Sequence, residues 1–398
     1  MPQKKLLIST LEPSGDLHAA YLIREIKRIS PDIKILGIGG EKMRAAGAEI
    51  IFDASNLGVV GIFEALPLLP ALLRTRRIAK KFLDQEKPDA LLCVDSQGFN
   101  LPLAAEARRR GIKTIYYIAP QEWLWGTAKG MKKVAATIDL IISIFEKEHE
   151  KYQAAGAHSV YFGHPLLDIV KTTMSRDEAR KEFLGTTEGP VICLCPGSRT
   201  HEIKTFLPIL LEAGRIIKEK TSGAPENGAH SPGATVKFIV PAATTKMAPR
   251  FSEYFPSDFR PTIVVGKTYD ALACADLAIC TSGTINLEAS LLGTSNIMTY
   301  KLSTLTFWIG KYIFKIMQKL PYLSMPNLLL NAPVIPELIM RDANPQKIAE
   351  EALAILSDRP RQEKMKSAFV ELRKRLGSPG VLEKAAKEVL RQLNIPKN

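Results

Sequence analysis

The sequence predicts an α/β protein made of two domains, each with a parallel β-sheet covered by helices on both faces. Short runs that are apolar throughout alternate with longer amphipathic runs, as expected of buried parallel strands and the helices that cover them. The alternation pauses near residues 165–175 and then restarts. Two such halves are expected to form a cleft between the carboxyl ends of their sheets, where open α/β sheets bind ligands.

The first half contains six predicted strands, at residues 5–10, 33–38, 90–95, 113–118, 140–145 and 159–162. Amphipathic runs between them predict helices, among them residues 16–29, 69–85 and 100–110. In the second half, strands are predicted at residues 191–195, 236–240, 262–265, 277–280 and 296–300. Residues 221–235 are rich in Gly, Pro and small polar residues and predict a surface loop. The last fifty or so residues predict helices that cap the sheets or cross back to the first domain.

The composition limits the classes of partner. The chain has 398 residues and carries 54 Lys and Arg against 41 Asp and Glu, a net charge of +13. Such a balance favours an anionic partner, which is a nucleic acid, a phosphorylated substrate or a membrane surface. Nucleic acid is disfavoured because the sequence lacks zinc-finger spacing, an RNA-recognition signature and a long basic arm. The sequence also predicts neither a signal peptide nor a transmembrane segment.

The five cysteines, Cys93, Cys193, Cys195, Cys274 and Cys280, all lie in apolar runs without C-x-x-C spacing. Only six histidines are available as further soft ligands. We therefore interpret the cysteines as buried thiols in a reducing cytosol and expect neither disulfides nor a metal site.

The stretch "CTSGTINLEASLLG" predicts a strand end, a turn and a helix. The backbone amides of Ser282, Gly283 and Thr284 would converge at the positive end of the helix dipole, where a phosphate binds well. Glu288, near the same end, would accept hydrogen bonds from ribose hydroxyls. The alternative is an ordinary Ser N-cap followed by an exposed Glu.

Two other strand-to-helix turns strengthen the phosphate interpretation. In "CPGSRTHEI" the strand is followed by Ser198 and Arg199, and a planar guanidinium can clamp a diphosphate with two hydrogen bonds. In "LEPSGDLHAA" a helix opens at Ser14 and Gly15, with Glu12 beside them. Neither the dinucleotide-binding G-x-G-x-x-G nor the P-loop pattern occurs at these turns.

Asp95, in "LLCVDSQGFN", is the candidate general base. It ends a buried strand, where a carboxylate is partly desolvated and its pKa can be tuned for proton abstraction. The alternative is an Asp that caps the following helix. His18, His164 and His201 are further candidates, and each has a structural interpretation as well.

Two stretches place apolar side chains next to basic ones. They are "VVGIFEALPLLPALLRTRRIAKK" and "LTFWIGKYIFKIMQK", and their candidate contacts with membrane or acyl chains are Ile62, Phe63, Leu66, Leu69, Trp308, Tyr312 and Lys315. Such a combination suits anionic headgroups and acyl chains. The alternative is that the apolar residues belong to the domain core and the lysines to a solvated face.

Eight motifs taken together resemble the lipid-A-disaccharide synthase family, namely "EPSGD", "DSQGFN", "APQEWLW", "FGHPL", "PGSRTHEI", "SGTINLE", "SMPNLL" and "PEL". They occur in the family's order and approximate spacing between about residue 5 and residue 385. The resemblance implies two Rossmann-like domains facing a central cleft (GT-B type), with C-terminal helices. The expected boundaries are residues 1–168 for the acceptor domain, 176–345 for the UDP-sugar domain and 346–398 for helices that pack back on the first domain or on a partner subunit.

The resemblance further implies an inverting, metal-independent glycosyltransferase with no cofactor. It would join UDP-2,3-diacylglucosamine to 2,3-diacylglucosamine 1-phosphate at the inner face of the cytoplasmic membrane, giving a β-1,6-linked disaccharide 1-phosphate and UDP. Asp95 would be the base on the acceptor 6-hydroxyl. The donor UDP would be held by Arg199, Ser198, Ser282, Gly283, Thr284 and Glu288, and the cleft would be lined by Glu12, Ser14, Gly15 and Asn327. Family precedent also suggests a homodimer.

The sequence departs from the family at the base. The family pattern D-x-P-D-F-N has a second acid where this chain has Gly98, and a proline where it has Gln97. Asp95 therefore works alone or with a partner from elsewhere. Two other functions stay open: an epimerase or cell-wall transferase that uses a soluble UDP-sugar, and a catalytically silent lipid-binding protein.

Overall fold

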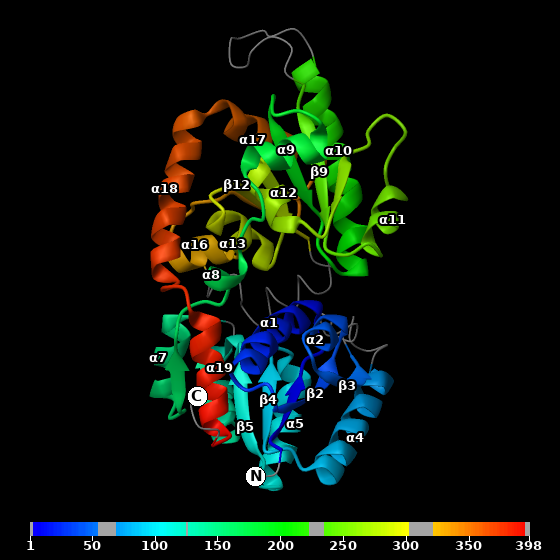
Figure 1. The fold of residues 1–398 in the computed structure, drawn as a ribbon. Helices are drawn as coiled ribbons and strands as arrows, with labels where there is room; N and C mark the ends of the chain where they lie inside the picture. The colour runs from blue at the N-terminus through cyan, green and yellow to red at the C-terminus, as the bar shows by residue number, and fades with distance from the viewer. Residues whose placement is uncertain (1–2, 55–68, 125, 223–234, 302–320, 395–398) are drawn as a thin grey trace. The chain divides into compact units, whose positions relative to one another are not determined.

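The computed structural model describes residues 3–54, 69–124, 126–222, 235–301 and 321–394. The chain divides into two compact units (Figure 1). The first unit contains Met1–Ile169 together with Leu376–Asn398, and the second contains Val170–Arg375.

The first unit is built on a seven-stranded parallel sheet with the strand order β3-β2-β1-β4-β5-β6-β7. The strands are β1 Lys5–Ser9, β2 Lys34–Gly39, β3 Glu49–Asp53, β4 Ala90–Val94, β5 Lys113–Tyr117, β6 Leu140–Ser143 and β7 Ser159–Tyr161. The central strands are buried along nearly their whole length, because helices cover both faces of the sheet. The order reverses between β1 and β4, as in a doubly wound Rossmann sheet.

The helices of this unit are α1 Pro13–Ile29, α2 Glu41–Ala45, α4 Leu69–Glu86, α5 Gln97–Arg109, α6 Ala128–Thr137, α7 Glu146–Ala154, α8 Leu166–Ile169 and α19 Val381–Gln392, with a 3-10 turn η2 at Gln121–Trp123. Helix α1 packs against α19 (Figure 1). Helix α4 packs against α5, and α5 packs against α6. Leu22, Ile23 and Ile26 form the buried stripe that holds α1 on the unit.

The last helix, α19, belongs to the first unit although the rest of the C-terminal third belongs to the second. The Asp168 carboxylate accepts hydrogen bonds from the amides of Gly380 (2.7 Å) and Leu382 (2.8 Å) at the start of this helix. The His164 amide donates to the Leu376 carbonyl at 2.8 Å. The two Asp168 bonds satisfy amides that a helix start leaves unpaired, and the three bonds together tie α19 to the segment that follows β7.

The second unit has a six-stranded parallel sheet with the order β10-β9-β8-β11-β12-β13. The strands are β8 Val191–Cys195, β9 Lys237–Ala242, β10 Thr262–Val265, β11 Leu277–Thr281, β12 Ser295–Tyr300 and β13 Glu337–Ile339. The order again reverses in the middle, here between β8 and β11.

The helices of the second unit are α9 Arg176–Leu184, α10 Thr200–Ser222, α11 Met247–Ser252, α12 Thr268–Cys274, α13 Thr284–Leu291, α16 Met325–Leu330, α17 Pro345–Ser357 and α18 Arg359–Arg375. Helix α10 packs against α17, and α13 packs against α16 and α18. Helix α9 opens with a complete capping box between Ser175 and Glu178.

The predicted fold class is confirmed, since both sheets are parallel and Rossmann-like. Two strands were not predicted, β3 and β13, and both lie at sheet edges where side chains are only partly buried. An edge strand needs no continuous apolar run, so its pattern is weaker than that of a central strand. Of the predicted loop at 221–235, residues 223–234 lie outside the described residues. Among the described helices, none combines the length and the apolar character needed to cross a bilayer.

Candidate functional site

Each sheet brings two of the predicted turns together at the point where its strand order reverses. In the first unit β1 pairs with β4, Ser9 beside Cys93, so the EPSGD turn and Asp95 follow neighbouring strand ends. In the second unit β8 pairs with β11, with Cys195 beside Cys280. The PGSR turn (residues 196–199) and the TSGT turn (residues 281–284) therefore also follow neighbouring strand ends. In doubly wound sheets this reversal point is where ligands bind.

Asp95 directly follows β4 in a strained conformation. Asp95 and Ser96 both have left-handed backbones, with φ of 52° and 51°. Each such non-glycine residue costs about 1–3 kcal/mol and persists only where the surroundings enforce it. Asp95 is half-buried, and its Oδ1 accepts the Ser96 amide at 2.8 Å. The residue at the N-cap of α5 is Ser96, so Asp95 precedes the cap, and its carboxylate accepts an amide at the start of this helix.

The side chains of Asn100 and Tyr116 enforce this turn. The Asp95 carbonyl accepts the Tyr116 hydroxyl at 2.6 Å and the Asn100 Nδ2 at 2.8 Å. Asn100 is fully buried, and its Nδ2 also donates to the carbonyls of Ser9 (3.0 Å) and Val94 (3.1 Å). Asn100 therefore joins the ends of β1 and β4 and holds the Asp95 backbone from beneath.

The EPSGD turn lies at the same edge. Glu12 occupies the N-cap position of α1, Ser14 lies in its first turn, and both are half-buried. Gly15 is buried, and a Cβ there would lie 2.0 Å from Thr10 Oγ1, so only glycine allows α1 to approach the end of β1 this closely. Asp16, in contrast, accepts the amides of Gly40 and Lys42 and starts helix α2, which is a structural role.

His18 and His164 are poor candidates for a base. Burial lowers the pKa of His164 to about 3 and that of His18 to about 4. The Nδ1 of His164 accepts the Leu166 amide at 3.2 Å, which fixes the residue as part of the backbone framework. His201, in the second unit, is exposed and contacts Thr205 of its own helix.

In the PGSR turn, a carboxylate occupies the concave side of the backbone. Glu202 Oε2 accepts the amides of Ser198 (3.0 Å) and Arg199 (3.1 Å), and its Oε1 lies 2.7 Å from Arg199 Nη1. Gly197 has a φ of 96°, and a Cβ at this position would lie 2.4 Å from the Glu202 carboxylate. The Glu202 carboxylate therefore binds the amides of Ser198 and Arg199 itself and also holds the Arg199 guanidinium.

The TSGT turn opens helix α13. Gly283 is the N-cap residue with φ 132° and ψ −163°, a conformation that is essentially restricted to glycine. The alternative of an ordinary Ser N-cap is therefore wrong for Ser282. A Cβ on Gly283 would meet no atom within 4 Å, and Gly283 and Thr284 are exposed, so a ligand can approach the backbone.

The start of α13 is supported from below. Asn286 is fully buried and donates to the Thr281 carbonyl at 2.8 Å, as Asn100 does at the corresponding strand end of the first unit. Burial raises the pKa of the Cys280 thiol at the end of β11, and the neighbouring Cys195 adds to this effect. Glu288 lies in α13 and is half-buried.

Asn327 has a structural environment in the second unit. It is 1% exposed, its Oδ1 accepts the amides of Val334 (2.8 Å) and Ile335 (2.9 Å), and its Nδ2 donates to Glu337 Oε1 at 2.9 Å. Glu337 in turn accepts the Ser324 amide and hydroxyl. The predicted contact of Asn327 with substrate stays a prediction, since these bonds already use both ends of its amide.

Of the predicted membrane contacts only Leu69 lies in the described ranges, whereas Ile62, Phe63, Leu66, Trp308, Tyr312 and Lys315 lie outside the described residues. Leu69 is 49% exposed and Leu73 is 48% exposed on α4. These two leucines therefore do not belong to the domain core, although Leu72 packs against it.

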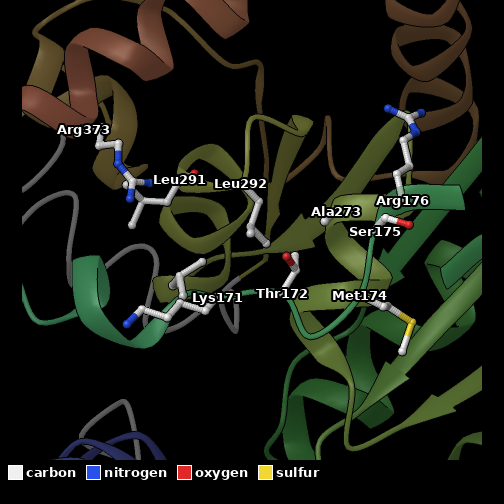
Figure 2. Close-up of a pocket in the computed structure, with 10 residues that line it drawn as sticks. Lys171, Thr172, Met174, Ser175, Arg176, Ala273, Leu291, Leu292 and Arg373 are labelled. Carbon is white, nitrogen blue, oxygen red and sulfur yellow. Dashed lines mark hydrogen bonds between the residues drawn. The ribbon is translucent and has the colours of Figure 1, made fainter. Parts of the chain in front are cut away.

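A separate pocket of about 600 Å³ opens on the second unit (Figure 2). The residues around it include the basic side chains of Lys171, Arg176 and Arg373. Arg176 pairs with Asp276, and Arg373 donates to the Leu291 carbonyl at 3.3 Å. None of the predicted donor-binding residues lines this pocket.

Sequence reasoning missed Glu202, Asn100 and Tyr116. Glu202 lies within the quoted PGSRTHEI motif, three residues after Arg199, a spacing that brings the two together at a helix start. Asn100 has a weaker signal, an amide side chain in the first turn of the helix that follows β4. Tyr116 belongs to a neighbouring strand, and no local pattern predicts its contact with Asp95.

Comparison with known proteins shows the family and the fold of this chain. A family model for lipid-A-disaccharide synthetase matches residues 6–391. The lipid-A-disaccharide synthase of Syntrophus aciditrophicus is 36% identical over 390 residues, 97% of each chain. That of Nitrosococcus oceani is 37% identical over 369 residues, which cover 92% of this chain and 91% of the relative.

Solved structures share the fold at low sequence identity. MurG of Acinetobacter baumannii is 13% identical with a TM-score of 0.55, covering 98% of this chain and 99% of that one. A UDP-GlcNAc 2-epimerase from Neisseria meningitidis bound to UDP-GlcNAc is 12% identical with a TM-score of 0.62, covering 99% and 100%. The fold is therefore of the GT-B type, and the sequence matches show that this chain belongs to the lipid-A-disaccharide synthase family of glycosyltransferases.

Proposed function

We propose that the chain transfers a diacylglucosamine unit from UDP-2,3-diacylglucosamine to 2,3-diacylglucosamine 1-phosphate, with inversion and without a metal ion. The products are the β-1,6-linked disaccharide 1-phosphate and UDP. The observation that carries the proposal is the strained, half-buried Asp95 at the strand-order reversal of the first sheet, in a chain of this family.

In the proposed reaction Asp95 removes the proton from the acceptor 6-hydroxyl. The acceptor oxygen attacks the anomeric carbon of the donor from the face opposite UDP, and the bond between that carbon and the UDP oxygen breaks. A single displacement inverts the anomeric centre and needs only one base. Glu12, Ser14 and Gly15 would lie on the acceptor side, and the described bonds of Asn100 and Tyr116 would keep Asp95 in place.

The second unit would bind UDP. Arg199 and the amides at the start of α13 would stabilise the negative charge that develops on the leaving diphosphate. In other enzymes a divalent cation stabilises this charge. Ser198, Ser282, Gly283 and Thr284 supply the turn backbones, and Glu288 would accept the ribose hydroxyls. UDP-GlcNAc bound to the epimerase of the same fold supports a UDP-sugar donor.

The decisive experiment measures UDP release with acylated and with unacylated sugar donors, each in the presence of its matching acceptor. The proposal expects release only with the acylated pair. Release with soluble UDP-sugars would instead support a cell-wall transferase. Conversion of a soluble UDP-sugar into its epimer without net UDP release would support an epimerase, and neither release nor epimerisation would support a lipid-binding protein.

A second experiment addresses the base. Asp95→Ala is expected to lower kcat by roughly a hundredfold to ten-thousandfold, as for the loss of a general base, with the far-UV circular dichroism unchanged. A folded variant with near wild-type kcat would remove Asp95 from this role.

We also propose that the protein binds peripherally to anionic membranes. The exposed Leu69 and Leu73 lie on α4 next to the exposed Arg74 and Arg77, an arrangement that suits a charged lipid surface. Flotation with vesicles that contain anionic lipid tests this directly, and Leu69→Ser with Leu73→Ser should reduce the bound fraction. No association at low salt would contradict it. The homodimer also stays a proposal, which sedimentation equilibrium would test.

A further inference from the structure

The loop after β5 carries an acidic side chain to the same sheet edge as Asp95. Strands β4 and β5 are parallel neighbours, with Val94 beside Tyr117, so the segments that follow them emerge together. Glu122 lies in η2, five residues beyond the end of β5, and is half-buried. Gln97, two residues after Asp95, donates its Nε2 to Glu122 Oε1 at 2.5 Å. The Gln97 side chain thus joins the turn of the candidate base to a second carboxylate.

The Glu122 carboxylate has a defined place. Its Oε2 accepts the Thr127 amide at 3.2 Å, and its carbonyl accepts the Gly126 amide at 3.2 Å. A Cβ on Gly126 would lie 1.7 Å from Glu122 Oε2, and one on Gly130 would lie 2.2 Å from it. Both glycines therefore leave room for the carboxylate, which is held in one position as catalytic and binding groups require.

The loop around Glu122 is anchored on both sides. The Tyr152 hydroxyl donates to the Pro120 carbonyl at 2.6 Å, and Lys151 Nζ donates to the Trp123 carbonyl at 3.1 Å. Tyr152 is fully buried, so this anchor is part of the core of the first unit. A carboxylate on such a loop is better placed to bind a ligand than one on a mobile side chain.

Position 98 carries no side chain, whereas position 122 carries a carboxylate. Gly98 is exposed in the first turn of α5, next to Gln97, and a Cβ there would meet no atom within 4 Å. The chain thus has no acid in the DSQGFN turn beyond Asp95, and the neighbouring loop supplies one through the Gln97 contact.

We propose that Glu122 is a second acidic residue of the acceptor site and that its carboxylate accepts a hydrogen bond from a hydroxyl of the acceptor sugar. This inference rests on the proposed function, because it takes the carboxyl edge around Asp95 as the acceptor side. Glu122 binds and orients the acceptor, while the proton transfer stays with Asp95. The simpler interpretation is that Glu122 only stabilises the start of α6 through the Thr127 amide.

Kinetics with the full-length enzyme separate these two roles. Glu122→Ala is expected to raise the acceptor KM by about tenfold to a hundredfold, the effect of losing one hydrogen bond to a charged group, with the donor KM unchanged. The control is Glu49→Gln, an exposed acid at the start of β3, which should leave both KM values unchanged. A loss of thermal stability with an unchanged acceptor KM would overturn the proposal.

A rescue experiment adds a measurement that would not change if Glu122 had only a structural role. Gly98→Asp places a carboxylate on the Asp95 turn, in open space, where it cannot cap α6. Added to Glu122→Ala, it is expected to recover at least a third of the lost acceptor affinity. No recovery in a folded double variant would also overturn the proposal.

Asp95→Asn in the same assay tests the proposed function independently, since it should lower kcat whatever Glu122 does. Full activity of Asp95→Asn would reject the assignment of the base. An unchanged acceptor KM in Glu122→Ala, with Asp95→Asn inactive, would reject only the inference about Glu122.

Discussion

The carboxylate of Glu202 lies 2.7 Å from the guanidinium of Arg199 and at the same time accepts the amides of Ser198 and Arg199. One acidic side chain thus shapes the turn after β8 and orients the arginine that is expected to meet the donor diphosphate. Both side chains are largely buried, with 28% of Arg199 and 21% of Glu202 exposed, so the pair is less screened than a surface ion pair.

Glu202→Ala is expected to weaken UDP binding by about tenfold, because the turn loses two accepted amide bonds and Arg199 loses the partner that fixes it. Isothermal titration of UDP measures the change, and the acceptor KM serves as the control because it should not move. Tighter UDP binding in the variant would mean instead that the carboxylate competes with the diphosphate for these amides.

Arg199→Lys is expected to weaken UDP binding by roughly tenfold while it retains the positive charge. A lysine ammonium lacks the planar fork that matches a diphosphate and cannot make two parallel hydrogen bonds. The measurement is UDP affinity in Arg199→Lys and Arg199→Ala, together with the acceptor KM. Equal losses for donor and acceptor would contradict the assignment of Arg199 to the donor.

Asn100→Ala is expected to destabilise the protein by about 3 kcal/mol and to lower kcat, because the buried carbonyls of Ser9 and Val94 lose the Asn100 amide and the Asp95 carbonyl keeps only the Tyr116 hydroxyl. Asn286→Ala is the matched variant in the second unit. It removes one bond to a strand end, so we expect about 1 kcal/mol of destabilisation and a weaker affinity for UDP instead. Urea unfolding and steady-state kinetics measure both. The prediction fails if the two variants have the same kinetic effect.

Glu148 is expected to make the first unit less stable as the pH rises. Burial raises the pKa of this carboxyl to about 8. Hydrogen bonds from the amides of Ile144 and Phe145 favour the charged form and partly oppose this rise. Between pH 4.5 and 8 the folded protein keeps a proton that the unfolded chain releases, so the free energy of unfolding falls as the pH increases. The effect is fully present above pH 8 and absent below pH 4.5.

Glu148→Gln removes this titration and keeps an oxygen that can accept the Ile144 amide. The difference in melting temperature between the variant and the wild type should therefore grow from pH 5 to pH 8 in favour of the variant. A difference that is independent of pH would show that Glu148 has the same pKa in both states.

The sequence by itself determined the class of fold and the identity of the principal turns. Buried parallel strands must be apolar along their length and their covering helices amphipathic, so the alternation over residues 5–10, 191–195 and 277–280 is a local signal. Small polar residues after these strands identified the turns that contain Ser14, Ser198 and Ser282. The edge strands β3 and β13 were not predicted, because a strand with one exposed side need not be apolar along its length.

The tertiary structure decided which of these turns are neighbours and how each polar side chain is held. Asn100 contacts Ser9 across 91 residues, Gly380 contacts Asp168 across 212, and Gln97 reaches Glu122 on the next loop. The left-handed backbone of Asp95 and Ser96 is likewise imposed by such contacts, since neither residue type requires it. A local pattern records only which residues are apolar or flexible, whereas strand order and hydrogen-bond partners arise when distant segments pack together.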